Sequence, residues 1–290
     1  METLIHQTVA GFATGGIYAS MALALVMIYQ ATGNVNFSQG EMAMFSTYIA
    51  WALIHAGIPY WAAFVLTVAF AFVLGAGVQH LLLRPLGNVP VLSMVTVFIG
   101  LLVIFNSVAG WLFTYTIKSF PSPFPDRPPF GQTYVSSHEL GTVGVTLAVL
   151  LLLFCFFRFT SLGLAMRAAA QNPVSSRLVG IRVGWMLALG WGLASAIGAV
   201  AGMMVAPVLY LDPNMMSGVL LYALAAALVG GIDSPLGAVI GGLIVGVLEN
   251  LVGTYLIGTE LKLTVALLLI VGVLVIRPSG LLGTRHVTKV

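Results

Sequence analysis

The chain has 290 residues, of which 60% are hydrophobic and 7% are charged, and its formal net charge is +3. A water-soluble domain usually carries about 25% charged residues, because its surface has to be solvated. The composition excludes an ordinary soluble enzyme, a disordered chain and a nucleic-acid-binding protein, and it predicts a polytopic membrane protein embedded in the lipid bilayer.

Stretches without Asp, Glu, Lys or Arg locate the predicted membrane spans, each of which needs about 20 apolar residues. They are expected to be helices, because lipid cannot satisfy backbone polar groups and the sequence lacks the alternation of a β-barrel. In chain order the spans lie near 8–30, 41–56, 60–83, 90–114, 141–158, 185–210, 217–232, 235–257 and 262–277. Several are short or rich in glycine, so the predicted fold is an all-α bundle of about eight to nine transmembrane helices.

The distribution of basic residues predicts the orientation, because cytoplasmic loops are enriched in Lys and Arg. This rule places the following residues inside: Arg84, Arg158, Arg167, Arg177, Arg182, Arg277, Arg285 and Lys289. It leaves Lys118, Arg127 and Lys262 outside. The proline-rich segment 118–140 is then an outer loop, 159–184 is an inner loop with helical potential on both sides of Pro173, and residues 1–290 form a single transmembrane domain.

A polar segment joins the first two predicted spans. It contains Asn34, Asn36, Ser38, Gln39 and Glu41, between two glycines that suit an irregular backbone. One interpretation is a solvent-exposed loop. The other is a re-entrant segment that lines a cavity, where irregular backbone is tolerated at membrane depth.

Polar side chains also occur within the predicted spans. Glu249 and Asn250 follow an uninterrupted apolar run, and an ionised carboxylate at the centre of a span costs on the order of 3 kcal/mol. Glu249 is therefore expected to face protein or water, either in a helix–helix contact or on a transport path. Asn106 is a weaker example of the same pattern.

The spacing of small residues predicts helix packing, and the sequence lacks common catalytic motifs. Glycines recur four residues apart at Gly11/Gly15, Gly198/Gly202, Gly237/Gly241 and Gly242/Gly246, which predicts close helix packing. The sequence has no Walker A motif, no HExxH zinc motif and no GxSxG nucleophile motif. We therefore expect no catalytic residues, no bound metal and no cofactor in this chain.

Four stretches together resemble the permease subunits of branched-chain amino-acid ABC importers, also called the hydrophobic amino-acid uptake family. They are GGIYASMALALVMIYQATGNVNFSQGEM (15–42), SLGLAMRAAAQNP (161–173) with LVGI (178–181), LYALAAALVGGIDSPLGAVIGGLIVGVLEN (221–250) and RPSGLLG (277–283). The resemblance covers nearly the whole chain and is closest to the shorter of the two permease types.

The resemblance implies a multi-pass protein of the bacterial inner membrane that works in a larger assembly. The implied partners are a second, homologous permease that forms a heterodimer, two cytoplasmic ABC ATPases and a periplasmic substrate-binding protein. ATP hydrolysis by the partners would drive branched-chain or related hydrophobic amino acids from periplasm to cytoplasm.

The same resemblance assigns roles to particular residues. The inner loop resembles the family's ATPase-coupling segment at Gly163, Arg167, Gln171, Asn172, Arg177 and Gly180. The match around the first polar segment strengthens a role in a translocation path or gate for Asn34, Asn36, Ser38, Gln39 and Glu41. Asn106, Glu249 and Asn250 are further candidates for the path.

Other functions remain as alternatives. A permease of the same family could carry urea, amides or small carboxylates. An ion-coupled secondary transporter would need intramembrane carboxylates, of which only Glu249, and Glu41 at an edge, are available. A membrane enzyme is disfavoured by the missing catalytic motifs.

Overall fold

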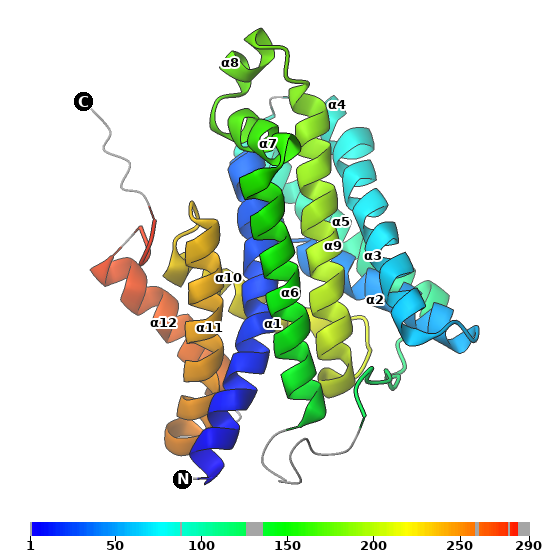
Figure 1. Cartoon of the computed structure of the whole chain (residues 1–290), viewed down its shortest axis with the longest axis vertical. Helices are drawn as coiled ribbons and strands as arrows, with labels where there is room; N and C mark the ends of the chain where they lie inside the picture. Colours follow the sequence, from blue (N-terminus) through cyan, green and yellow to red (C-terminus); the bar gives the residue numbers. More distant parts are fainter. Residues whose placement is uncertain (1, 88, 126–135, 259–260, 278, 284–290) are drawn as a thin grey trace. The chain divides into compact units, whose positions relative to one another are not determined.

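The structure is a computed structural model that describes residues 2–87, 89–125, 136–258, 261–277 and 279–283 (Figure 1). These residues form helices and turns, and within them the one backbone bridge joins Lys118 and Leu211. The chain divides into two compact units. Unit 1 comprises Met1–Val26, Phe124–Gly144 and Gly218–Val290, and unit 2 comprises Met27–Pro123 and Val145–Ser217.

Every predicted span coincides with a helical segment. These are α1 (Glu2–Thr32), α2 (Gln39–His55), α3 (Tyr60–Gly77), α5 (Val91–Phe113), α6 (Ser137–Phe159), α9 (Val183–Leu209), α10 (Met215–Gly230), α11 (Pro235–Val252) and α12 (Lys262–Ile276). The π-helical segment η1 (Val78–Leu83) and α4 (Arg84–Leu86) extend α3, and the π-helical segment η3 (Gly253–Ile257) extends α11. The inner loop forms α7 (Ser161–Gln171) and α8 (Pro173–Leu178), so the expected helices on both sides of Pro173 are confirmed.

The helices differ in length. Within the described residues, six helical segments are long and apolar enough to cross a membrane: His6–Thr32, Tyr60–Leu86, Val91–Phe113, Ser137–Phe159, Val183–Leu209 and Pro235–Leu256. The helices α2, α10 and α12 have 17, 16 and 15 residues. At a rise of about 1.5 Å per residue they are roughly 22–26 Å long, which is less than the hydrocarbon thickness of about 30 Å.

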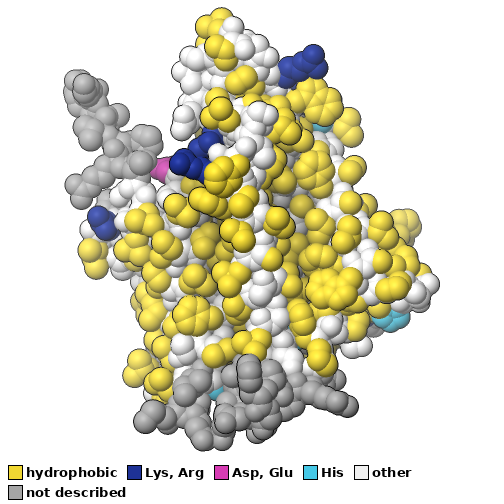
Figure 2. Space-filling model, viewed as in Figure 1, with side chains coloured by type: hydrophobic (Ala, Val, Ile, Leu, Met, Phe, Trp, Pro, Cys, Tyr) yellow, Lys and Arg dark blue, Asp and Glu magenta, His cyan; other side chains and the backbone are white. Residues whose placement is uncertain are grey.

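Unit 2 is built around α9, which packs against α2 and α3. Glycines allow this close approach, since a Cβ added at Gly202 would collide with the Thr47 hydroxyl of α2. A Cβ at Gly75 of α3 would lie 2.5 Å from the Trp191 carbonyl oxygen of α9. Large apolar side chains face outward instead, such as Leu92 and Trp111 of α5, which are 80% and 81% exposed. Figure 2 shows hydrophobic side chains covering the flank of α3 and α9, as expected for a surface in contact with lipid.

The ends of unit 2 differ in charge. Arg84 lies in α4, Arg158 ends α6, Arg177 lies in α8 and Arg182 precedes α9, and Figure 1 shows α4, α7 and α8 at the same end of this unit. Lys118 pairs through its backbone with Leu211, just beyond the other end of α9. This separation within unit 2 agrees with the predicted orientation. Arg127, Arg285 and Lys289 lie outside the described residues.

Unit 1 depends on contact between α1 and α11. A Cβ at Gly246 would collide with the Gly15 backbone, and one at Gly242 would collide with the Ala19 backbone. On the other face of α11, a Cβ at Gly241 would collide with the Ala226 carbonyl group of α10. The predicted close packing is therefore confirmed for Gly11/Gly15 with Gly242/Gly246, whose helices approach backbone to backbone.

Replacing Gly246 with valine is expected to separate α1 from α11 and to destabilise the protein. Overpacking usually costs about 1–3 kcal/mol, and here backbone rather than a movable side chain is in the way. Gly272→Val in α12 is the matched control, because among the described residues no heavy atom outside its own helix lies within 4 Å of a Cβ at that position. Thermal unfolding in detergent should show a lower Tm for Gly246→Val, and equal Tm values for the two variants would contradict this packing.

Candidate functional site

The polar segment between α1 and α2 is mostly buried in unit 2. Asn36, Ser38 and Gln39 are each 0% exposed. The Asn36 Oδ1 atom accepts hydrogen bonds from the Ser38 backbone N–H (3.1 Å) and from Ser38 Oγ (2.7 Å). The Asn36 amide nitrogen donates to Gln39 Oε1 at 3.4 Å. The side chains therefore satisfy one another inside protein, unlike those of a solvent-exposed loop.

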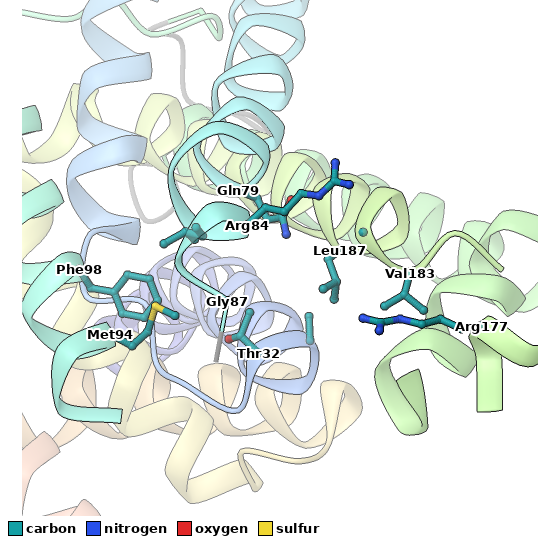
Figure 3. Close-up of a pocket in the computed structure, with 12 residues that line it drawn as sticks. Thr32, Gln79, Arg84, Gly87, Met94, Phe98, Arg177, Val183 and Leu187 are labelled. Carbon is teal, nitrogen blue, oxygen red and sulfur yellow. The ribbon is translucent and has the colours of Figure 1, made fainter. Parts of the chain in front are cut away.

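The position of α2 along α9 shows how far this segment enters the unit. Gln39 Nε2 donates to the Ala194 carbonyl oxygen at 2.9 Å, and α9 begins at Val183. At a rise of about 1.5 Å per residue, Ala194 lies roughly 17 Å along α9. Thr32, by contrast, lies near the start of α9, because Thr32 and Val183 line one cavity (Figure 3). Residues 33–38 therefore run inward from the end of α1, and α2 begins within the bundle, which explains its short length.

Glu41 and Asn106 lie together nearer the other end of unit 2. Glu41 is 4% exposed and is a hydrogen-bonding neighbour of the Asn106 amide. Asn106 Nδ2 also donates to the Pro213 carbonyl oxygen (2.8 Å) and to Asn214 Oδ1 (3.2 Å). Glu41 Oε2 is buried without a hydrogen-bond partner among the described residues. Asn34 is separate from this group, because its amide nitrogen donates to the Thr32 carbonyl oxygen at 3.0 Å.

The predicted polar pair of α11 belongs to unit 1. Asn250 Nδ2 donates to Thr14 Oγ1 of α1 (2.8 Å) and to the Gly246 carbonyl oxygen (3.0 Å). Glu249 is 7% exposed, and its carboxylate accepts hydrogen bonds from the hydroxyl groups of Tyr18 and Tyr222. Their rings stack with centroids 4.9 Å apart. The carboxylate thus joins α1, α10 and α11, so of the two surroundings expected for Glu249, protein or water, the structure shows protein.

Sequence reasoning missed the partners of Glu249 and Asn250. Thr14 lies between Gly11 and Gly15 and Tyr18 follows them in α1, and that glycine pair was the available signal that this face of α1 meets another helix. No pattern in the sequence indicated that Tyr222 would contact Glu249. Glu249 Oε2 has no hydrogen-bond partner among the residues that the structure describes.

The predicted coupling segment forms two capped helices in unit 2. Thr160 Oγ1 accepts from the Gly163 N–H (3.0 Å) to cap α7, and Asn172 Oδ1 accepts from the Ser175 N–H (2.9 Å) to cap α8. Pro173 occupies the first turn of α8, where its missing N–H is not needed. Gly180 follows with φ +85°, a conformation that favours glycine.

The two faces of α7 differ. Met166 and Ala169 are buried, at 8% and 1% exposure, and α7 packs against α9. Arg167, Gln171 and Asn172 are exposed, as is Leu164. A Cβ at Gly163 would lie 2.5 Å from the Phe156 carbonyl oxygen, so the tight turn from α6 into α7 requires glycine. The arrangement presents arginine and amide groups on a helix that is anchored from behind.

Within unit 1, residues after α12 contact the end of α10. In the RPSGLLG stretch, the Leu281 and Leu282 N–H groups donate hydrogen bonds to the carbonyl oxygens of Val229 (2.8 Å) and Gly230 (2.9 Å) at the end of α10. The following turn contains Ser234, whose Oγ accepts from the Gly237 N–H at 3.0 Å and caps α11. Two stretches that are distant in the sequence therefore form one structural junction.

Comparison with known proteins finds similarity along nearly the whole chain. Residues 7–274 match the family described as "Branched-chain amino acid transport system / permease component". The high-affinity branched-chain amino acid transport system permease protein LivH of Escherichia coli K12 is 31% identical over 303 residues, covering 99% of this chain and 97% of that protein. The corresponding protein BraD of Pseudomonas aeruginosa is 30% identical over 307 residues, covering 99% and 98%.

More distant similarity extends to an archaeal relative and to one solved structure. A probable branched-chain amino acid transport permease protein LivH of Methanocaldococcus jannaschii is 29% identical over 286 residues, covering 91% of this chain and 87% of that protein. The structure of PsaBC from Streptococcus pneumoniae in complex with Fab has a similar fold, with a TM-score of 0.51, 14% identity and coverage of 93% and 91%. Since the family match and the relatives extend over nearly the whole length, this multi-pass membrane protein belongs to the family of branched-chain amino acid transport system permease components.

Proposed function

We propose that this chain is the permease subunit of an ATP-driven importer for branched-chain or related hydrophobic amino acids. The observation that carries the proposal is the full-length similarity, at 30–31% identity, to permeases named for high-affinity branched-chain amino acid transport. The bundle supplies apolar helices and isolated buried amides and carboxylates, which suits a path that releases its solute rather than retaining it.

The proposed assembly resides in the bacterial inner membrane. It contains this chain, a second homologous permease as a heterodimer partner, two cytoplasmic ATPases and a periplasmic substrate-binding protein. In this proposal α2, α10 and α12 complete a bundle of nine membrane helices, and the short length of α2 is explained by its start inside protein at Gln39. The chain itself carries no ATP-hydrolysing motif, so hydrolysis is assigned to the partners.

The helices α7 and α8 are proposed to dock on an ATPase subunit. Their capped ends and buried Met166 and Ala169 fix them to unit 2, so a push on the exposed face would be transmitted to α9. The exposed docking face contains Arg167, Gln171 and Asn172, with Arg177 in α8. Gly163 and Gly180 supply the turns at either end of the segment.

Two separate clusters of buried polar side chains, one in each unit, are proposed to serve the translocation path. In unit 2, Asn36, Ser38 and Gln39 hold the start of α2, and Glu41 with Asn106 lies further along the same unit. In unit 1, Glu249 and Asn250 join α1 to α10 and α11. Asn34 is proposed to fix the end of α1, because its hydrogen bonds go to Thr32.

Uptake measurements in the native host test the substrate class. Deleting the gene for this chain is expected to abolish high-affinity uptake of radiolabelled leucine, isoleucine or valine, and a plasmid copy should restore it. Urea and a short carboxylate serve as comparison solutes in the same cells. Unchanged amino acid uptake with reduced uptake of urea or the carboxylate would contradict the proposal and favour another substrate of this family.

A further inference from the structure

Two segments of the chain meet at the end of unit 2 that is opposite α7 and α8 (Figure 1). The first, residues 114–120, follows α5, and we call it the strap. The second, residues 210–214, connects α9 to α10, and we call it the linker. Lys118 of the strap and Leu211 of the linker exchange two backbone hydrogen bonds of 2.9 Å each. The predicted orientation places this end on the outer side of the membrane.

The strap and the linker begin with the same unusual backbone conformation. Thr114, directly after α5, has φ 66° and ψ 163°, and Tyr210, directly after α9, has φ 64° and ψ 162°. Among the described residues these are the two non-glycine residues with positive φ. This region is essentially confined to glycine, because the side chain of any other residue is strained there. Both segments that form the bridge therefore leave their helices through a strained residue.

Contacts with neighbouring helices fix the strap. The Ser119 carbonyl oxygen accepts a hydrogen bond of 3.2 Å from Trp51 Nε1 of α2. Phe120 is 5% exposed, and its ring meets the Tyr60 ring of α3 edge-on, with centroids 6.2 Å apart. A strained residue persists only where surrounding contacts determine its conformation. The strain at the start of the strap is thus maintained by α2, α3 and the bridge to the linker.

The linker is held from within unit 2. Leu211 is 0% exposed, and the Pro213 carbonyl oxygen and Asn214 Oδ1 accept hydrogen bonds of 2.8 and 3.2 Å from the Asn106 amide of α5. The same amide is the hydrogen-bonding neighbour of the buried Glu41 carboxylate. Because one amide contacts both the linker and Glu41, displacement of the linker changes the surroundings of a candidate residue of the path.

We propose that the Lys118–Leu211 bridge is the strained latch of an outer gate. The structure shows the latch closed, and it opens when the transporter accepts substrate from outside. Opening lets Thr114 and Tyr210 relax, so their strain lowers the free energy that opening requires. The linker then moves away from Asn106. This inference rests on the proposed function, which requires a state that is open to the outer side.

Paired glycine and alanine substitutions test the strain. At Thr114 and at Tyr210 both replacements remove the side-chain contacts, but alanine keeps the strained Cβ atom and glycine does not. Thr116→Gly and Thr116→Ala form the control pair, because Thr116 lies in the strap without a positive φ. Hydrogen exchange of the Lys118 and Leu211 amides is followed by mass spectrometry. The sample is the full chain with its permease and ATPase partners in lipid nanodiscs, without nucleotide.

The expected pattern depends on the position. Exchange of the bridge amides reports how often the latch opens. At Thr114 and Tyr210 glycine should slow this exchange by about fivefold or more relative to alanine, because glycine removes strain from the closed form. At Thr116 glycine should not slow it, because there glycine only adds backbone freedom. Exchange in the middle of α9 should be equal within each pair, which checks the fold.

Two exchange results would overturn the latch. The first is faster exchange with glycine than with alanine at all three positions, as expected for a strap that any glycine loosens. The second is equal exchange within the pairs at Thr114 and at Tyr210, as expected if neither residue is strained.

A reversible cross-link tests whether the latch must open during transport. Residues that exchange both backbone hydrogen bonds have Cα atoms about 5.5 Å apart, which a disulfide can span. Lys118→Cys and Leu211→Cys are combined in a Cys155→Ser background, because Cys155 is an exposed free thiol. Oxidation is expected to reduce leucine uptake to less than about a tenth of its value before oxidation, because the gate cannot open. Dithiothreitol should restore the uptake.

The wild-type complex is treated with the same oxidant and reductant in parallel. If the wild type takes up leucine and the cross-linked protein does so at an undiminished rate, the gate is wrong and the proposed function stands. If the wild type takes up no leucine, the proposed function itself fails, whereas the exchange pattern still tests the strained latch.

Discussion

Arg167→Glu is expected to reduce amino acid uptake to less than about a tenth of the wild-type rate, because like charges brought together at an interface cost several kcal/mol. Arg167 is exposed on α7, whereas its neighbours Met166 and Ala169 are buried. The substitution should therefore leave α7 folded and the protein in the membrane. ATP hydrolysis by the partner subunits should continue without transport, because the contact that carries the movement is weakened.

The measurement compares uptake and ATPase rates in proteoliposomes that contain equal amounts of each complex. Arg158→Glu is the matched control, since Arg158 is also exposed near this end of unit 2 but precedes α7 and lies outside the docking segment. Normal uptake by Arg167→Glu would count against the docking role. Equal loss in the two variants would assign the effect to the net charge of the cytoplasmic surface instead.

Glu249→Leu is expected to impair folding and transport much more than Glu249→Gln. Leucine would leave the hydroxyl groups of Tyr18 and Tyr222 without their acceptor, at a cost of about 1–3 kcal/mol for each unsatisfied buried group. Glutamine keeps an acceptor oxygen of similar reach, so the junction of α1, α10 and α11 should persist. The difference in stability and uptake between the two variants measures how much of the role of this carboxylate is hydrogen bonding.

Thermal unfolding and uptake are measured for both variants. The expected order of Tm is wild type, Glu249→Gln, then Glu249→Leu, with uptake falling in the same order. If both variants lose uptake equally while Glu249→Gln keeps its Tm, then the negative charge itself is required on the path. That result would contradict a role confined to joining helices.

The sequence predicts the positions of the helices well, because charged and turn residues interrupt the apolar runs. The span expected near 90–114 is observed as Val91–Phe113, and the one near 185–210 as Val183–Leu209. The first helix is longer than expected, Glu2–Thr32 instead of 8–30, since no helix breaker precedes Gly33, whose φ of +72° ends it. Boundaries follow from local chemistry, so they are readable from one sequence.

Contacts between helices are less readable. The glycine pairs predict that some helices approach closely, but four-residue spacing alone does not identify Gly15 and Gly246 as partners. The burial of Asn36 and Gln39 similarly depends on α9, which is more than a hundred residues away in the sequence. The two interpretations of this segment therefore could be separated only once its neighbour was known.

No sequence pattern predicted the cavity that is lined by α1, α4, α5, α8 and α9. Arg84 and Arg177 were interpreted through topology and docking, and Gln79 was one polar residue in an apolar span. The fold places residues of α1, η1, α4, α5, α8 and α9 around one cavity in unit 2. Patterns of single residues predict depth in the membrane, whereas a cavity depends on the arrangement of several helices.

The source of energy is the most direct test of the function proposed for this chain. The purified complex of this permease with its partner permease and ATPases is reconstituted in liposomes with the substrate-binding protein on the outer side, and radiolabelled leucine uptake is followed. Uptake is expected to require ATP at the ATPase subunits and to be indifferent to imposed H⁺ or Na⁺ gradients. Uptake by this chain alone, driven by an ion gradient without ATP or the binding protein, would contradict the account.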